Sequence, residues 1–144
     1  LRPPRSTLFP YTTLFRSTEF VWITAESLGD NDPALNYHSN LPAVFIFDKP
    51  LLNYLQLSTK RIIFLLDCLR ELSNKRSTQV YLDNPIEYLK NKNFACTFAA
   101  VPKYKKITRV NIPTSEFPSV RLVKPINFYP SSYSSWKKRI ELNI

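Results

Sequence analysis

The sequence is poor in the residues that most catalytic and metal-binding motifs require. Gly29 is the only glycine among 144 residues, which excludes a glycine-rich loop that cradles phosphates. His38 is the only histidine, and no serine or cysteine nucleophile arrangement accompanies it to form a triad. Cys68 and Cys96 lie in apolar runs without Cys-x-x-Cys spacing, so we expect buried free thiols. We therefore predict neither a catalytic residue nor a metal site in this chain.

Long apolar runs are also missing. No run approaches the roughly 20 residues that a membrane helix needs, and residues 1–17 lack the apolar core of a secretory signal. We expect a monomeric cytoplasmic protein that does not act at a membrane. Its net charge of +9 is compatible with contact to DNA or another polyanion, but equally with solvated basic faces.

The beginning of the chain differs in character from the rest. Residues 7–17 read TLFPYTTLFRS, which resembles a translated sequencing adapter. Residues 1–17 show no sustained period of a helix or a strand. We treat them as an artefactual or disordered leader and expect the chain to be a piece of a longer gene product.

Several short apolar runs predict the strands of a parallel sheet. Residues 20–23 and 44–47 are apolar without alternation, as strands covered on both faces must be. Residues 78–82 and 94–99 predict a third and a fourth strand, and residues 120–123 a fifth strand at an edge. Residues 48–50 are interpreted as a turn.

Helix signals separate these strands. Asp32-Pro33 and Asn84-Pro85 combine a cap with proline in the first turn, and both predict helix starts. The strongest helix is predicted from residue 59 to 75, with an apolar stripe at spacings of three and four. Residues 103–111 suit a basic helix. The alternation predicts a Rossmann-like, doubly wound parallel sheet of about five strands in a three-layer α/β/α domain, with ligands beyond the carboxyl ends of the strands.

Three motifs follow one another between residues 20 and 72. They are Asp32-Pro33-Ala34-Leu35, a strand that closes on Asp48, and Ser58-Thr59-Lys60-Arg61 at the start of the strongest helix. Their order and spacing resemble the beginning of the DNA photolyase and cryptochrome family. The loop after the first strand departs from that family, because Thr24-Ala25-Glu26-Ser27-Leu28 stands where many members carry Arg-x-Asp-Leu-Arg.

The resemblance implies a domain plan and a function. Residues 18–124 would form the α/β antenna domain, and residues 125–144 the start of a linker to a missing helical domain that binds FAD. An antenna pigment, a folate or a deazaflavin, would bind in the α/β domain, with Asp48, Lys60 and Arg61 at antenna or domain-interface positions. The full-length protein would be a photolyase, a carbon-carbon lyase that repairs DNA with light, and this piece alone would be inactive.

Two other interpretations stay open at this stage. A stand-alone α/β module that binds a nucleotide or small acidic ligand would share the same sheet and charge. A blue-light signalling cryptochrome would share the whole domain and differ only in the missing part. For Asp48 a turn residue, and for Lys60 and Arg61 solvated residues of a first helical turn, are the alternatives to a ligand-binding role.

Overall fold

The computed structural model describes residues 17–121, 123–124, 127 and 129–140. The predicted leader therefore lies almost entirely outside the described residues. The strands are β1 (Phe20–Ile23), β2 (Ala43–Asp48), β3 (Thr78–Asp83), β4 (Phe94–Thr97) and β5 (Ser115–Phe117). The helices are α1 (Pro33–Tyr37), α2 (Lys49–Leu55), α3 (Thr59–Ser73), α4 (Pro85–Tyr88), α5 (Pro102–Val110) and α6 (Tyr133–Lys137).

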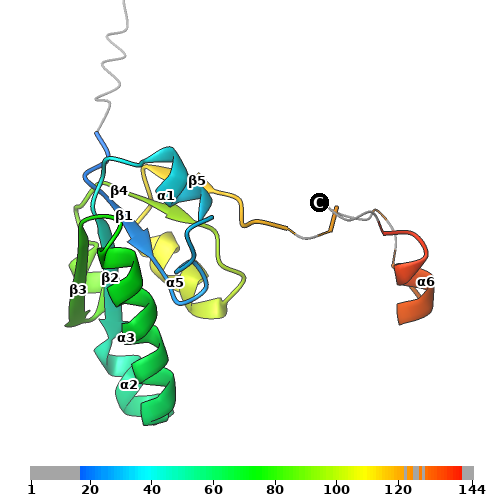
Figure 1. Ribbon diagram of the computed structural model, residues 1–144, viewed down its shortest axis with the longest axis horizontal. Coiled ribbons are helices and arrows are strands. Elements are labelled where there is room, and N and C mark those ends of the chain that lie inside the picture. Colours follow the sequence, from blue (N-terminus) through cyan, green and yellow to red (C-terminus); the bar gives the residue numbers. More distant parts are fainter. Residues whose placement is uncertain (1–16, 122, 125–126, 128, 141–144) are drawn as a thin grey trace, which may run out of the picture.

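The five strands form one parallel sheet in the order β3-β2-β1-β4-β5 (Figure 1). The chain starts at the centre with β1, adds β2 and β3 on one side, and then crosses to add β4 and β5 on the other. The central strands β1 and β4 are buried at every position, because helices cover both faces. The predicted doubly wound, three-layer α/β fold is confirmed.

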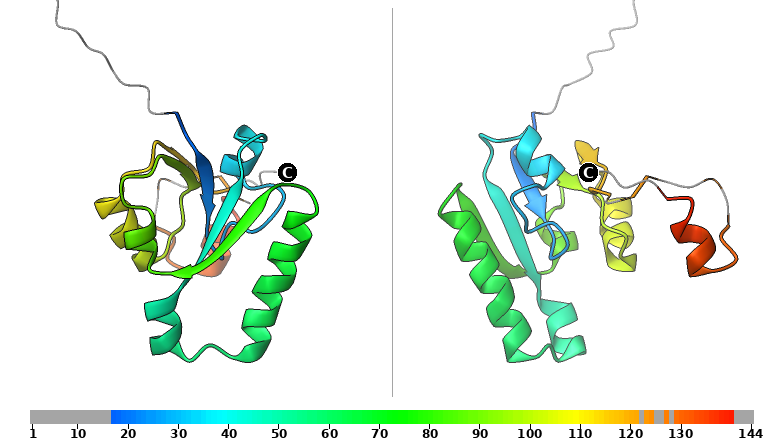
Figure 2. Two further views of the ribbon diagram at one scale, coloured as in Figure 1. Left: turned by 90° about the vertical axis from the view of Figure 1, so that its left-hand side faces the viewer. Right: turned by 45° about the vertical axis from the view of Figure 1, so that its right-hand side comes forward.

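Two apolar layers hold the helices against the sheet. On one face, Val21, Ile23 and Phe45 pack with residues of α1 and α3. On the other face, Phe20 and Trp22 pack with residues around α4 and α5. Figure 2 shows these helices on opposite sides of the sheet. Since adjacent residues of β1 alternate between the two layers, the strand must be apolar throughout, as its sequence is.

The fifth strand lies earlier than predicted. The prediction of a strand at residues 120–123 is wrong, because the strand that pairs with β4 is Ser115–Phe117. The Thr114 amide donates to the Phe94 carbonyl at 2.8 Å, and the Phe98 amide to the Phe117 carbonyl at 2.7 Å. Val120 is 66% exposed, and Leu122 lies outside the described residues. A short edge strand is fixed by its backbone pairing, which an apolar count does not detect.

The turn predicted at residues 48–50 is also wrong, since it is the start of a helix. Asp48 is the N-cap of α2, and its side chain accepts a hydrogen bond from the Leu51 amide at 3.0 Å. α2 continues beyond the carboxyl end of β2, and α3 begins nearby with Ser58 as its cap. These two helices therefore extend past the carboxyl edge of the sheet.

The segment after β5 leaves the α/β domain. α6 stands apart from the sheet (Figure 1) and buries none of its residues. Its ring pair, Tyr133 and Trp136, lies at a centroid distance of 5.6 Å. Among the described residues, none of the helices has the length and apolarity that crossing a bilayer demands.

Candidate ligand-binding site

A cavity of about 320 Å³ opens at the carboxyl edge of the sheet. Its walls come from the ends of β1 and β2, the loop after β1, α2, the first turns of α3, and α5. β1 is the strand from which the chain winds in both directions, and the crevice outside such a strand is where doubly wound domains bind ligands. The cavity therefore occupies the place that the strand order predicts for a ligand.

The loop after β1 forms a fixed part of this wall. The Thr24 amide donates to the Ser27 hydroxyl at 2.9 Å, and the Ser27 amide donates to the Thr24 carbonyl at 3.0 Å. These two bonds close a tight turn that places Ala25 and Glu26 at the cavity. Short polar side chains bonded to nearby backbone are a usual way to hold such a turn without glycine.

The Asp48 carboxylate is the most buried charge on the cavity wall. Its side chain is 11% exposed. One oxygen caps α2 through the Leu51 amide, and the other, Oδ2, forms an ion pair with the Lys103 ammonium of α5. Oδ2 makes no other hydrogen bond to the described residues. Asp48 thus ties the end of β2 to the start of α5, on opposite sides of the cavity.

Lys103 occupies an unusual position for a cation. It lies in the first turn of α5, where the helix dipole disfavours positive charge. Burial lowers the pKa of the Lys103 ammonium, and the nearby charge of Lys106 adds to the effect. The Asp48 carboxylate acts in the opposite sense, because it stabilises the charged form. The ion pair explains why a half-buried lysine is tolerated in the first turn of this helix.

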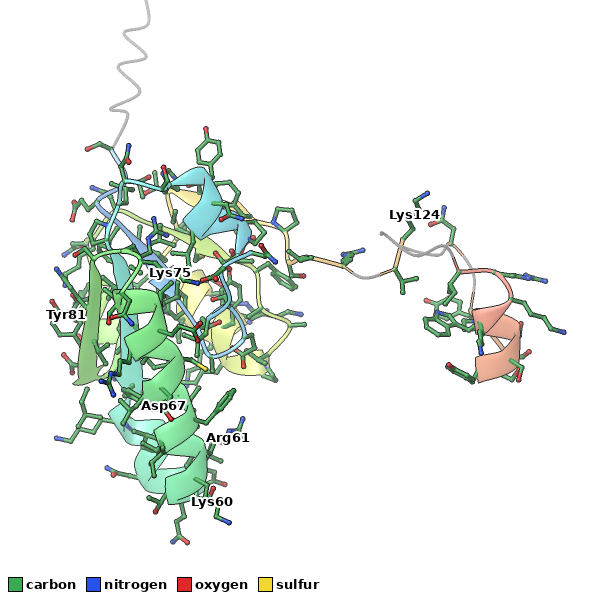
Figure 3. All side chains as sticks on the ribbon, viewed as in Figure 1. Lys60, Arg61, Asp67, Lys75, Tyr81 and Lys124 are labelled. Carbon is green, nitrogen blue, oxygen red and sulfur yellow. The ribbon has the colours of Figure 1, made fainter. Side chains whose placement is uncertain are left out.

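The predicted pair Lys60 and Arg61 separates in the structure. Both lie in the first turn of α3, at the end of the helix farthest from α1 (Figure 3). Both residues are exposed, but only Arg61 lines the cavity. Of the three predicted site residues, Asp48 and Arg61 therefore meet at one cavity and Lys60 lies outside it.

The cavity also contains an aromatic cluster that sequence reasoning missed. The rings of Trp22 and Tyr104 stack at a centroid distance of 5.8 Å and an interplanar angle of 3°, and both line the cavity. The Tyr104 hydroxyl donates to Glu116 Oε1 at 2.5 Å and lies 3.2 Å from Cys96 Sγ. The available signal was the spacing of Tyr104 and Ile107, which are the buried residues of α5.

Chemically, the cavity combines apolar walls with a few charged groups. Leucines of α2 and α3, Phe45, Phe47 and the stacked rings supply the apolar surface. Glu26, Asp48, Arg61 and Lys103 supply the charges. In the described part of the chain, no group of three or more His, Cys, Asp or Glu side chains is arranged to hold a metal ion. The arrangement suits a flat, largely apolar ligand with a charged or polar edge.

The two cysteines differ in accessibility, and a thiol reagent should distinguish them. Cys96 is buried in the core as expected, but Cys68 on α3 is half-buried, contrary to expectation. Burial raises the pKa of the Cys96 thiol to about 12, and the thiolate is the reactive form. At pH 8 we expect one thiol per chain, that of Cys68, to react rapidly in the folded protein. In urea we expect both thiols to react rapidly. Rapid reaction of both thiols in the folded protein would contradict the packing around Cys96.

Comparison of this chain with known proteins gave no match among protein-family models, curated proteins or solved structures.

Proposed function

We propose that this chain is the pigment-binding α/β domain of a photolyase- or cryptochrome-like flavoprotein. The observation that carries the proposal is the apolar cavity at the switch point of the sheet, bordered by Trp22, Tyr104 and Arg61. The resemblance of residues 20–72 to that family supports it independently. The expected ligand is an antenna pigment, a deazaflavin or a folate.

The size and lining of the cavity fit a ring system better than a nucleotide phosphate. Ligand pockets commonly enclose about 300–1,000 Å³ and are mostly apolar with a few placed polar groups. This cavity, at about 320 Å³, is near the lower end of that range. With Gly29 as its only glycine, the sequence lacks a glycine-rich loop of the kind that usually holds phosphates. A heteroaromatic ring would lie among the apolar walls, with Arg61 close to an anionic edge.

Exposed apolar side chains support a partner domain. The outer strand β3 and the outer surface of α3 expose large apolar residues: Ile63, Phe64, Leu66, Val80, Tyr81 and Leu82. Neighbouring domains commonly cover such surfaces. In the proposed full-length protein, the helical domain binds FAD and DNA and carries out the repair, while this domain supplies a pigment site and a scaffold.

Direct titration of the full chain tests the proposal. Absorbance and fluorescence of 5-deazaflavin, FMN and methenyltetrahydrofolate are followed as protein is added, with ATP as a comparison ligand. Saturable binding of a pigment, and weaker binding of ATP, is the expected result. Preferential binding of ATP would favour a stand-alone nucleotide module. If the folded protein bound none of these pigments saturably, the proposal would be wrong.

Adjacent residues of α3 provide a matched pair of variants. Arg61→Gln and Lys60→Gln each remove one positive charge from the same helical turn, but only Arg61 lines the cavity. We expect Arg61→Gln to weaken binding of an anionic pigment about tenfold, which corresponds to ~1.4 kcal/mol, and Lys60→Gln to leave it nearly unchanged. Fluorescence titration measures both. Equal losses of affinity in the two variants would mean that pigment binding depends only on the overall charge of the chain.

Reading the source gene beyond residue 144 tests the larger assembly. Several hundred further residues of helical, tryptophan-bearing sequence are expected. A stop codon directly after Ile144 would contradict the proposed partner domain. Repair of cyclobutane dimers by the full-length protein under blue light would then separate a photolyase from a purely signalling cryptochrome.

A further inference from the structure

Lys103 brings a primary amine to the largely apolar cavity. Among the described residues it is the only lysine that lines this cavity, and its side chain is 34% exposed. The stacked rings of Trp22 and Tyr104 line the same cavity. A flat ligand held among the apolar walls would therefore lie close to an amino group.

The surroundings of this amine favour its reaction with a carbonyl group. Only the unprotonated form of a lysine has the lone pair that attacks a carbonyl carbon, and an apolar pocket activates a lysine by favouring that form. Burial lowers the pKa of the Lys103 ammonium, and the charge of Lys106 acts in the same direction. Lysines that form imines with ligands commonly owe their reactivity to burial of this kind.

Asp48 offers both a proton acceptor and a counter-ion for such a reaction. Its Oδ2 forms the ion pair with the Lys103 ammonium and accepts no hydrogen bond from the described residues. The carboxylate can therefore take the ammonium proton without losing another contact. A protonated imine at the same nitrogen is positively charged, so the buried carboxylate would keep a cationic partner after the reaction.

We propose that Lys103 is a covalent attachment site for a flat aromatic aldehyde, with Asp48 as the proton carrier and counter-ion. The ammonium proton passes to Asp48 Oδ2, and the Lys103 nitrogen forms a bond to the aldehyde carbon. A proton moves from this nitrogen to the former carbonyl oxygen, which gives a carbinolamine. Asp48 then returns its proton to the hydroxyl group, the carbon–oxygen bond breaks, and water leaves. The products are one water molecule and a protonated imine beside the Asp48 carboxylate, so atoms and charge balance.

The lining of the cavity favours an aromatic aldehyde over a small or phosphorylated one. Apolar side chains and the stacked rings surround a volume of about 320 Å³, which suits a ring system. The sequence has no glycine-rich loop for a phosphate. This inference does not rest on the proposed function, because deazaflavins and folates contain no aldehyde group. A pigment bound in the same cavity would shield Lys103.

Reductive trapping of the full chain tests the attachment site. The folded protein is incubated with 6-methoxy-2-naphthaldehyde and sodium cyanoborohydride, which converts an imine into a stable secondary amine, and peptide mass spectrometry locates the label. We expect Lys103 to be labelled at least about tenfold more than Lys105 or Lys106, which are exposed on the same helix. Equal labelling of the three lysines would overturn the proposal. With acetaldehyde the preference for Lys103 should fall several-fold, and an unchanged preference would overturn the assignment to aromatic aldehydes.

Conservative variants provide matched controls. Lys103→Arg retains the positive charge beside Asp48 but has no primary amine, so naphthyl fluorescence attached to the protein should fall several-fold. Lys105→Arg and Lys106→Arg should leave it nearly unchanged, and urea unfolding verifies that each variant is folded. Fluorescence that Lys103→Arg leaves unchanged in folded protein would contradict attachment at Lys103.

The role of Asp48 has its own measurement. Without the reductant, a protonated imine absorbs at a longer wavelength than the neutral imine, so absorbance at neutral pH reports the charge of the adduct. Asp48→Asn should lower the protonated fraction several-fold, because the carboxylate no longer stabilises the positive charge. Glu26→Gln removes another carboxylate of the cavity, one that forms no ion pair with Lys103, and should change it little. Equal spectra for Asp48→Asn and the parent adduct would refute the counter-ion.

Competition with FMN separates this inference from the proposed function. FMN is titrated into the full chain before the aldehyde is added. Saturable FMN binding that slows the labelling of Lys103 would support both proposals and place both ligands in one cavity. Selective labelling of Lys103 by folded protein that binds none of the pigments would support the attachment site and count against the pigment domain. Pigment binding with equal labelling of Lys103, Lys105 and Lys106 would refute the attachment site alone.

Discussion

Replacing Phe94 by alanine is expected to lower the free energy of unfolding by about 3–5 kcal/mol, the usual cost of deleting a buried phenyl ring. Phe94 is fully buried in β4. Its ring stacks on Phe20 at a centroid distance of 6.1 Å and meets Trp22 edge to face at 5.8 Å. The substitution would leave a void in the apolar layer between the sheet and the helices α4 and α5, where close packing limits how far the neighbouring side chains can move to fill it. Urea unfolding followed by tryptophan fluorescence measures the change.

Phe64 provides the matched control for this prediction. It carries the same side chain but is 64% exposed on α3. Phe64→Ala should change the free energy of unfolding by no more than about 0.5 kcal/mol, as surface substitutions usually do. If both variants lost similar stability, the layer formed by Phe20, Trp22 and Phe94 would not be the centre of the core.

The central strands could be predicted because burial on both faces requires a run of apolar residues, which the sequence shows. Four consecutive apolar residues in β1, and three in β4 before Thr97, follow directly from strands covered on both faces. The edge strand β5 has no such apolar run. Ser115 and Glu116 are polar, and the strand exists because its backbone pairs with β4. Backbone pairing depends on the neighbour, which a local pattern cannot reveal.

The helix starts show how one signal can be read in two ways. Asp32, Asp48 and Asn84 each cap a helix, and each is followed by proline within the first turn. Two of these were predicted as helix starts, and the third was interpreted as a turn. The difference is that Asp48 is also the last residue of β2, so its cap and the following proline were interpreted as the turn that ends the strand. The cap chemistry was nevertheless sufficient, since aspartate side chains satisfy the first free amides of a helix.

The candidate site could be located from the sequence only at the level of the sheet edge. Strand order places ligands beyond the carboxyl ends of the strands, and Asp48 follows from that rule. Its partner Lys103 lies 55 positions later in the chain, since 103 − 48 = 55, and meets it through the packing of α5. The stack of Trp22 on Tyr104 likewise depends on how α5 crosses the sheet. Contacts of this kind come from tertiary structure alone.

Asp48→Ala is the substitution with the second largest expected effect, a loss of about 2–3 kcal/mol in the free energy of unfolding. Removing the cap of α2 accounts for about 1 kcal/mol. Leaving the Lys103 ammonium without its partner accounts for about 1–2 kcal/mol. The second contribution is below that of a fully buried pair, because the Lys103 side chain is 34% exposed. Urea unfolding at pH 7 measures the loss.

Two further variants separate the contributions of Asp48. Asparagine caps helices about as well as aspartate, so Asp48→Asn should retain α2 and lose only the ion pair, about 1–2 kcal/mol. Lys103→Met added to Asp48→Ala should recover part of the loss, because no unpaired charge is left beside the cavity. If Asp48→Asn were as stable as the parent chain, the ion pair would contribute nothing to folding. Asp48 would then serve the domain through its cap, and its buried carboxylate oxygen would be available to a ligand in the cavity.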